Sequence, residues 1–204
     1  MIESLYSSFK YVLEITWPML FVSLVLFISI RVSYLIKNKE KFIFHKEVFM
    51  LLFASYILCL FQVVTSQDIN TSTGNNFIPF VEIFRYEPFG RLFIKNIVGN
   101  VIMFIPYGFF VSKYASGKNF ILSLFLIFLA SFSIECTQLA IGRIFDVDDI
   151  ILNVFGGIIG YSIYVFLDNL YNSLPKIFRK NWFLNLTSFI LLVGIIAFII
   201  LLIL

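Results

Sequence analysis

Long apolar segments separated by short polar connections make up most of this chain. A helix needs about 20 mostly apolar residues to cross the hydrocarbon core of a bilayer. We therefore predict an all-α fold, a polytopic transmembrane helical bundle of about six spans. The expected spans are Trp17 to Ile36, Glu47 to Thr65, Asn96 to Val111, Phe120 to Ile141, Asp149 to Leu167 and Phe183 to Leu204.

Two regions depart from the pattern of a simple span. Near the N-terminus, apolar residues recur at helical spacing between serines and charged residues, which is typical of a helix lying in the membrane interface. The third span is short, and because Pro106 and Gly108 interrupt it, we expect a break or kink there. An outer loop of about 30 residues, 66–95, precedes that span. The apolar positions of the N-terminal helix are Ile2, Leu5, Tyr6, Phe9 and Leu13.

The composition indicates an integral membrane protein. The chain is 60% hydrophobic and 13% charged, which is about half the charged fraction of a soluble domain. The charges are scattered over short connections, so no basic stripe indicates nucleic-acid binding. Cys59 and Cys136 both lie in apolar segments and imply no disulfide framework. Because the chain shows no internal repeat and no linker, we predict a single domain over residues 1–204.

The basic residues predict the orientation in the membrane. The ends and connections that follow the first, third and fifth spans hold 10 of the 15 lysines and arginines. Basic residues are enriched on the cytoplasmic side of membrane proteins. We therefore expect both termini outside, with the 66–95 loop, the end of the fourth span and the start of the fifth span on the outer face.

Glu135 is the most informative single residue, because it lies inside the fourth span. An ionisable side chain is costly in a bilayer, so it normally faces the bundle interior and marks a functional site. Ser131, Glu135 and Gln138 share one face of the helix at spacings of four and three. Gly142 is expected to end this helix. Arg143 can then either turn back to pair with Glu135 or project toward an anionic head group.

Polar side chains of three spans are expected to reach the same depth near the outer face. Glu135 and Asp149 are the predicted catalytic residues, since a pair of carboxylates can perform acid–base chemistry. The predicted substrate-binding residues are Asn100, Gln138, Arg143, Asp146, Asp148 and Asn153.

These residues also have structural interpretations. Asp148 or Asp149 can cap the fifth span, and the two asparagines can form hydrogen bonds between helices. Gly156 and Gly160 favour close helix packing. The aspartates offer oxygen ligands that suit magnesium or calcium. Their spacing fits no metal motif, however, so we predict no metal and no cofactor.

Five motifs resemble those of the VanZ-like family of bacterial membrane proteins, which is named for a teicoplanin-resistance protein. The resemblance covers about residues 75–165. It implies a multi-pass protein of the bacterial plasma membrane and cell envelope. The polar positions that it implies were all chosen above, and they are Asn100, Glu135, Gln138, Arg143, Asp149 and Asn153. The motifs are NFIPF (Asn76 to Phe80), GNVIMFIPYG (Gly99 to Gly108), IECTQ (Ile134 to Gln138), GRIFDVDD (Gly142 to Asp149) and ILNVFGGIIGY (Ile151 to Tyr161).

Three functions fit these observations. The first is an outer-face site that binds or modifies an outer-leaflet substrate, either a phospholipid, a lipid-linked cell-wall precursor or a lipoglycopeptide. The resemblance adds an expected effect on teicoplanin susceptibility in a Gram-positive host. The second is a non-enzymatic assembly or regulatory partner of another membrane protein. The third is a small transporter, which the apolar inner halves of the third to fifth spans disfavour. Membrane lipids are expected partners in each case.

Overall fold

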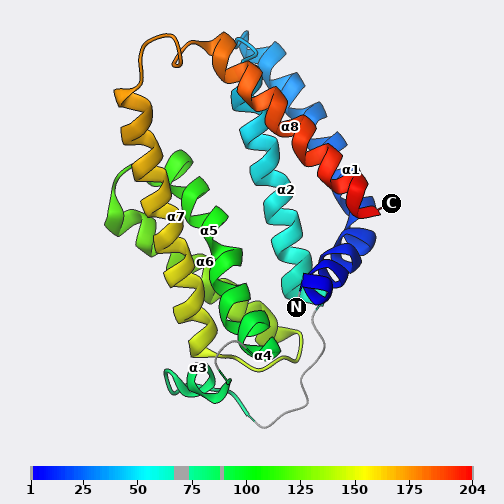
Figure 1. Cartoon of the computed structure of the whole chain (residues 1–204), viewed down its shortest axis with the longest axis vertical. Helices are drawn as coiled ribbons and strands as arrows, with labels where there is room; N and C mark the ends of the chain where they lie inside the picture. The colour runs from blue at the N-terminus through cyan, green and yellow to red at the C-terminus, as the bar shows by residue number, and fades with distance from the viewer. Residues whose placement is uncertain (1, 67–73, 88–89, 204) are drawn as a thin grey trace. The chain divides into compact units, whose positions relative to one another are not determined.

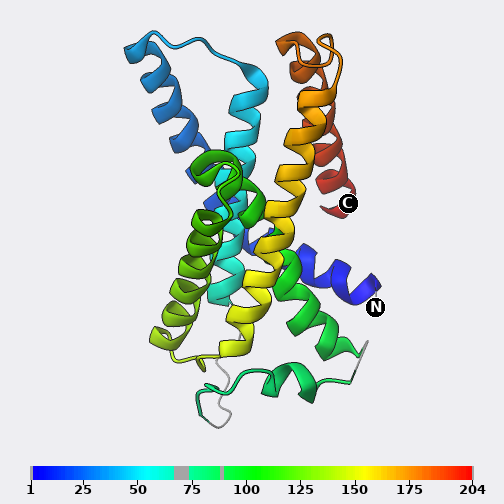
Figure 2. The same cartoon turned by 90° about the vertical axis from the view of Figure 1, so that its left-hand side faces the viewer.

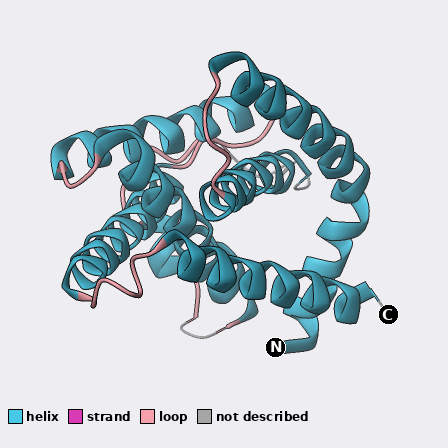
Figure 3. Cartoon of the chain, turned by 90° about the horizontal axis from the view of Figure 1, so that it is seen from above, coloured by secondary structure: helices cyan, strands magenta, loops and turns pink. Residues whose placement is uncertain are grey.

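The structure, a computed structural model, describes residues 2–66, 74–87 and 90–203 (Figure 1). Within that part of the chain, six helices are long and apolar enough to cross a membrane, which confirms the predicted all-α polytopic bundle. The view in Figure 3 shows how completely helices account for the described chain. The candidate spans are Trp17–Asn38, Phe44–Thr65, Arg91–Ser116, Phe120–Ala140, Val147–Ser173 and Asn181–Phe198.

The chain divides into two compact units, which are described separately. Unit 1 comprises Met1–Val63 and Ser173–Leu204, and unit 2 comprises Val64–Asn172. Unit 1 therefore contains the first two spans and the last one, and unit 2 contains the three middle spans. The expectation of a single domain stays a prediction.

Unit 1 is built from α1 (Ile2–Asn38), most of α2 (Phe44–Ser66) and α8 (Asn181–Ile203). The expected N-terminal interfacial helix and the first span are continuous, because α1 is a single helix. Pro18 lies inside this longer helix. At the start of α2, the backbone N–H of His45 donates to Asn185 Oδ1 at 3.0 Å and so joins α2 to α8.

The third span is a continuous helical run. The expected break is wrong, because α5 passes through both Pro106 and Gly108, whereas a kink at Pro106 stays a prediction. A proline is tolerated in a spanning helix where neighbouring groups satisfy the backbone carbonyl that it leaves free. The irregular turns lie at the two ends of α5 instead, where the backbone is π-helical. The run consists of α4 (Arg91–Phe93), η1 (Ile94–Val98), α5 (Gly99–Val111) and η2 (Ser112–Ser116).

Unit 2 is completed by α3 (Val81–Arg85), α6 (Phe120–Ala140) and α7 (Val147–Ser173). Two glycines of α7 allow it to approach α5 closely. A Cβ added at Gly156 would meet the carbonyl oxygen of Val101, and a Cβ added at Gly160 would meet that of Ile105. These contacts confirm that the glycine pair packs helices together. They also bring the polar residues of α5 and α7 within reach of each other.

The described part of the 66–95 loop folds against the turn between α6 and α7. An isolated parallel β-bridge pairs Asn76 with Asp146. The N–H of Asn76 donates to the Phe145 carbonyl at 2.9 Å, and the N–H of Val147 donates to the Asn76 carbonyl at 3.1 Å. Figures 1 and 2 both place α3 beside the start of α7. The loop therefore packs against the end of unit 2 that carries the predicted polar residues.

Candidate functional site

Glu135 lies on α6 in the interior of unit 2, with only 1% of its surface exposed. Ser131 and Gln138, one turn away on either side, are also buried, so the predicted polar face of α6 is confirmed. Glu135 Oε2 accepts a hydrogen bond from the backbone N–H of Asp146 at 3.1 Å. The Glu135 carboxylate therefore ties α6 to the turn that leads into α7.

The end of α6 reverses the chain in a Schellman motif. Gly142 has a φ of 86°, in the left-handed region that favours glycine. Its N–H donates to the Leu139 carbonyl at 3.1 Å, and the N–H of Arg143 donates to the Gln138 carbonyl at 2.9 Å. Gly142 therefore follows the end of α6, as predicted, and this geometry brings Arg143 back beside the last turn of the helix.

Gln138 connects Arg143 to Glu135. With its amide oriented to match its neighbours, the Gln138 nitrogen donates to Glu135 Oε1 at 2.9 Å, and its oxygen accepts from Arg143 Nη1 at 2.5 Å. Nη1 also donates to the Val64 carbonyl at 3.4 Å. Arg143 therefore turns back toward Glu135. Gln138 bridges the two side chains, and the described residues show no direct ion pair between Arg143 and Glu135. Its Nε and Nη2 groups make no hydrogen bond within the described residues.

Asp146 is the residue that caps α7. Its Oδ1 accepts from the N–H of Asp148 at 2.8 Å, as an N-cap side chain does. The same oxygen accepts from Asn76 Nδ2 at 2.9 Å. The sequence predicts a helix that begins at Asp149 and therefore indicates Asp148 or Asp149 for this role. The helix begins at Val147 instead, which moves the cap to Asp146.

Asp148 stabilises a different helix. Its buried carboxylate accepts from the N–H of Phe80 at 2.5 Å and from the N–H of Ile83 at 3.2 Å. These are N–H groups at the start of α3 that have no partner inside their own helix. The negative charge also lies at the positive end of that helix. Asp148 therefore fastens the 66–95 loop to α7.

Two more contacts link the three spans of unit 2. Asn100 Nδ2 on α5 donates to Asp149 Oδ1 on α7 at 2.5 Å. Asn153 Nδ2, one turn further along α7, donates to Ser131 Oγ on α6 at 3.1 Å. Asn153 is only 2% exposed, and its Oδ1 has no hydrogen-bond partner in the described part of the chain. Polar side chains of α5, α6 and α7 thus converge as the sequence indicated.

The structure divides the predicted residues into connected groups. Glu135, Gln138, Arg143 and Asp146 form one network, whereas Asp148 faces the loop. The pairs formed by Asn100 with Asp149 and by Asn153 with Ser131 add further contacts between helices.

Sequence reasoning missed the asparagines of the loop. Asn75 Oδ1 accepts from the Phe145 N–H at 3.1 Å. Asn76 bonds the backbone of Phe145 and Val147 and the side chain of Asp146. A signal was present, because Asn76 opens the NFIPF motif. The third partner that was missed, the Val64 carbonyl, is a backbone group, and no side-chain pattern identifies it.

The carboxylates of this region are engaged with protein donors. The Asp146 and Asp148 side chains accept backbone N–H groups of the loop and of the α7 start. Among the described residues, no group of three or more His, Cys, Asp or Glu side chains could hold a metal ion. The group with remaining hydrogen-bonding capacity in the Glu135 network is the Arg143 guanidinium, which suits a phosphate or carboxylate.

Comparison with known proteins gives one match. The sequence model of the VanZ/LLP1 family matches residues 44–168. This range covers more than half of the chain and includes every residue of the networks described above. No curated protein and no solved structure matches the chain.

Proposed function

The chain belongs to the VanZ/LLP1 family and is a multi-pass integral membrane protein, and we propose that it binds an envelope substrate at the α6–α7 turn of unit 2. The proposed substrate is an outer-leaflet molecule with an anionic group, either a lipid-linked cell-wall precursor or a lipoglycopeptide. Binding there would alter the susceptibility of a Gram-positive bacterium to teicoplanin.

This proposal depends on the position of Arg143, whose guanidinium is bound by Gln138 and by the Val64 carbonyl. Glu135 holds Gln138, and Gln138 holds one guanidinium nitrogen, so the remaining N–H groups are fixed in direction. A planar guanidinium can bind a carboxylate or phosphate through two parallel hydrogen bonds. Fixing it before binding lowers the entropy that binding would otherwise cost.

In this proposal Glu135 is a positioning residue. Its two carboxylate oxygens are bonded to Asp146 and Gln138, so it organises Arg143 rather than meeting the substrate. An enzymatic version would need Glu135 or Asp149 to exchange a proton with the substrate. The hydrogen bonds of Glu135 to the protein favour the binding version.

The location of the site follows from the charge distribution. The basic connections of the chain are expected on the cytoplasmic side, which puts the α6–α7 turn and the 66–95 loop at the outer face. An anionic group on an outer-leaflet lipid would then meet Arg143 at the boundary of the bilayer.

We expect expression of this protein to lower the teicoplanin susceptibility of a sensitive Gram-positive host. Arg143→Ala should remove this protection, because the group that meets the substrate is lost. The measurement is the inhibitory concentration of teicoplanin at matched levels of protein in the membrane.

Two control variants separate the site from its surroundings. Arg91→Ala removes an exposed arginine of the same unit outside the network, and Thr137→Val changes an exposed side chain on α6 whose hydroxyl bonds its own helix. Both should protect like the wild type. The proposal fails if the wild-type protein gives no protection, or if Arg143→Ala protects fully.

A further inference from the structure

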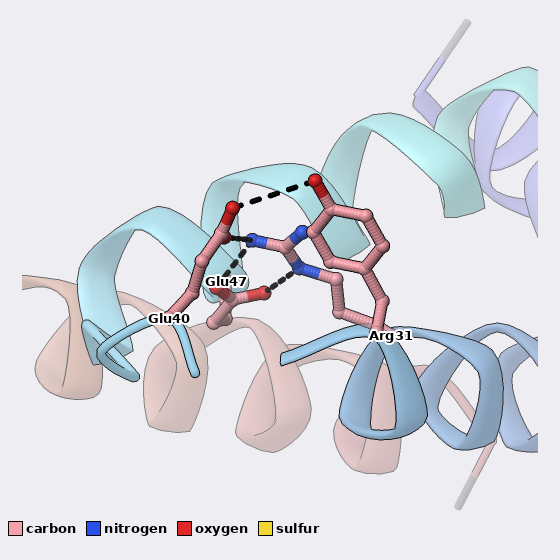
Figure 4. A network of polar contacts seen from close by, with 4 residues as sticks. Arg31, Glu40 and Glu47 are labelled. Atoms are coloured by element: carbon pink, nitrogen blue, oxygen red, sulfur yellow. Dashed lines mark hydrogen bonds and ion pairs between the residues drawn. The ribbon is translucent and has the colours of Figure 1, made fainter. Parts of the chain in front are cut away.

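Unit 1 contains an ion pair within its spans that the proposed function does not use. Arg31 on α1 binds Glu47 on α2 through two hydrogen bonds, Nε to Oε2 at 2.9 Å and Nη2 to Oε1 at 3.0 Å (Figure 4). Glu47 is buried. Such a pair with two parallel bonds has a defined geometry. It therefore fixes how the first two helices meet at this end.

The ion pair also engages the second acidic residue of this region. Glu40 Oε2 lies 3.9 Å from Arg31 Nη2, and the Tyr34 hydroxyl donates to Glu40 Oε1 at 3.4 Å (Figure 4). Residues 31–47 hold five basic and two acidic residues, which leaves a net charge of +3. Both acidic residues face Arg31, so the surplus positive charge belongs to the lysines. These are Lys37, Lys39, Lys41 and Lys46.

An apolar groove begins beside these lysines. A cavity of about 400 Å³ is lined by apolar residues of α1 and of the α1–α2 connection, with Lys39 and Glu40 at its edge. A second cavity of about 210 Å³ is lined by apolar residues of α1, α2 and α8 and by the Arg31–Glu47 pair. The two cavities adjoin, because Val32, Leu35 and Phe42 line both.

The apolar lining of the groove and the positive charge of the lysines beside it indicate what kind of molecule the groove would bind. A groove between spanning helices is surrounded by acyl chains, which fit its apolar wall. Basic pockets between such helices on the cytoplasmic side bind anionic lipid head groups. The lysines of this connection contribute most to the expected cytoplasmic bias of the chain. A neutral lipid would fill the same apolar wall but would bring no net negative charge to the surplus lysines of residues 31–47.

We propose that this groove, named here the α1–α2 groove, binds an anionic phospholipid. One acyl chain lies along Leu35 and the apolar residues of α1, α2 and α8, and the phosphate meets the ammonium group of Lys39. This site lies within unit 1 and is independent of the Arg143 site of unit 2.

The test is photocrosslinking of the full-length protein in phosphatidylcholine vesicles. The probes are trace amounts of phosphatidylglycerol or phosphatidylcholine that carry a photoreactive group in one acyl chain, and mass spectrometry locates the labelled peptides. We expect the phosphatidylglycerol probe to label residues 27–51 more strongly than the phosphatidylcholine probe does. Lys39→Gln should lower that labelling about five-fold, the contribution of one lysine near an anionic head group.

Matched variants make the outcome specific. Val32→Trp fills the groove and should abolish the labelling, whereas Val193→Trp, at a similarly exposed position of α8 outside the groove, should not. Lys180→Gln, in another basic connection, should leave the labelling unchanged. Equal labelling by the two probes, or unchanged labelling in Lys39→Gln, would overturn the proposal.

Discussion

At the scale of single residues, the account depends on one buried carboxylate and the groups that satisfy it. Glu135 accepts the Asp146 N–H and the Gln138 side chain, so its burial is compensated by hydrogen bonds on both oxygens. A buried polar group without partners costs more free energy than a satisfied one contributes. Removing Glu135 therefore takes away hydrogen bonds that hold the α6–α7 turn and the Gln138 side chain that binds Arg143.

Glu135→Ala should lower the free energy of unfolding by about 1–3 kcal/mol, because the part-buried Asp146 N–H and the buried Gln138 amide lose the carboxylate that accepts from them. Glu135→Gln should cost less, since an amide oxygen can still accept that N–H. Unfolding of the purified protein in detergent measures both values.

Ser133→Ala is a suitable control, because Ser133 is exposed on α6 and its hydroxyl donates to the carbonyl of Leu129 in the same helix. It should change stability by no more than about 0.5 kcal/mol. Equal stability of Glu135→Ala and Ser133→Ala would contradict the structural role given to Glu135.

The residue patterns that could be predicted were those within one helix. The spacing of Ser131, Glu135 and Gln138 fixed their common face, and Gly142 identified the end of α6. The partners across the chain could not be predicted in this way. Asn76 and Asp146 are 70 positions apart, and only the fold of the loop brings them together.

At the scale of elements, two features position the site. Glycines allow α7 to contact the backbone of α5, and Asp148 fastens α3 to the start of α7. The exact start of α7 depends on this loop, because Asp146 caps the helix while it also binds Asn76. The sequence could not show that dependence, and the expected helix start was therefore two residues too late.

Gly160→Leu should prevent the close contact of α7 with α5 and reduce the amount of folded protein in the membrane. Overpacking of this kind costs about 1–3 kcal/mol or more. Gly194→Leu is the matched control, because a Cβ added at Gly194 on α8 would meet nothing within 4 Å. If both variants accumulate equally, the α5–α7 contact is not as close as described.

Asp148→Ala should loosen α3, since two N–H groups at its start lose their acceptor. A helix cap contributes about 1 kcal/mol. Limited trypsin digestion should cut faster after Arg85 in this variant than in the wild type. Asp168→Ala, which removes a partly exposed partner of Lys118, should leave cleavage at Arg85 unchanged.

At the scale of the whole molecule, the orientation in the membrane decides what the site can meet. We expect a cysteine at position 85 to react with an impermeant maleimide in intact cells and a cysteine at position 39 to stay unlabelled. Both positions are exposed, so access depends on the side of the membrane. The native Cys59 and Cys136 are first replaced by alanine. Labelling of position 39 but not of position 85 would move the Arg143 site to the cytoplasmic face.

The number of spans was predictable because apolar length alone sets it. The continuity of the third span was not, since Pro106 in an isolated sequence indicates a break. Backbone partners supplied by the surrounding helices decide whether that break occurs. The Val64 carbonyl that accepts from Arg143 could not be predicted either, because it is a backbone group that only the fold brings close.

The central claim is that Glu135 acts through Arg143, and a double-mutant cycle on teicoplanin susceptibility tests it most directly. Wild type, Glu135→Gln, Arg143→Ala and the double variant are compared in one host at equal membrane levels. Residues that act as a unit give non-additive effects. We predict that both single variants lose protection and that the double variant loses no more than Arg143→Ala alone. Protection by Glu135→Gln equal to that of the wild type, or additive losses in the double variant, would contradict the claim.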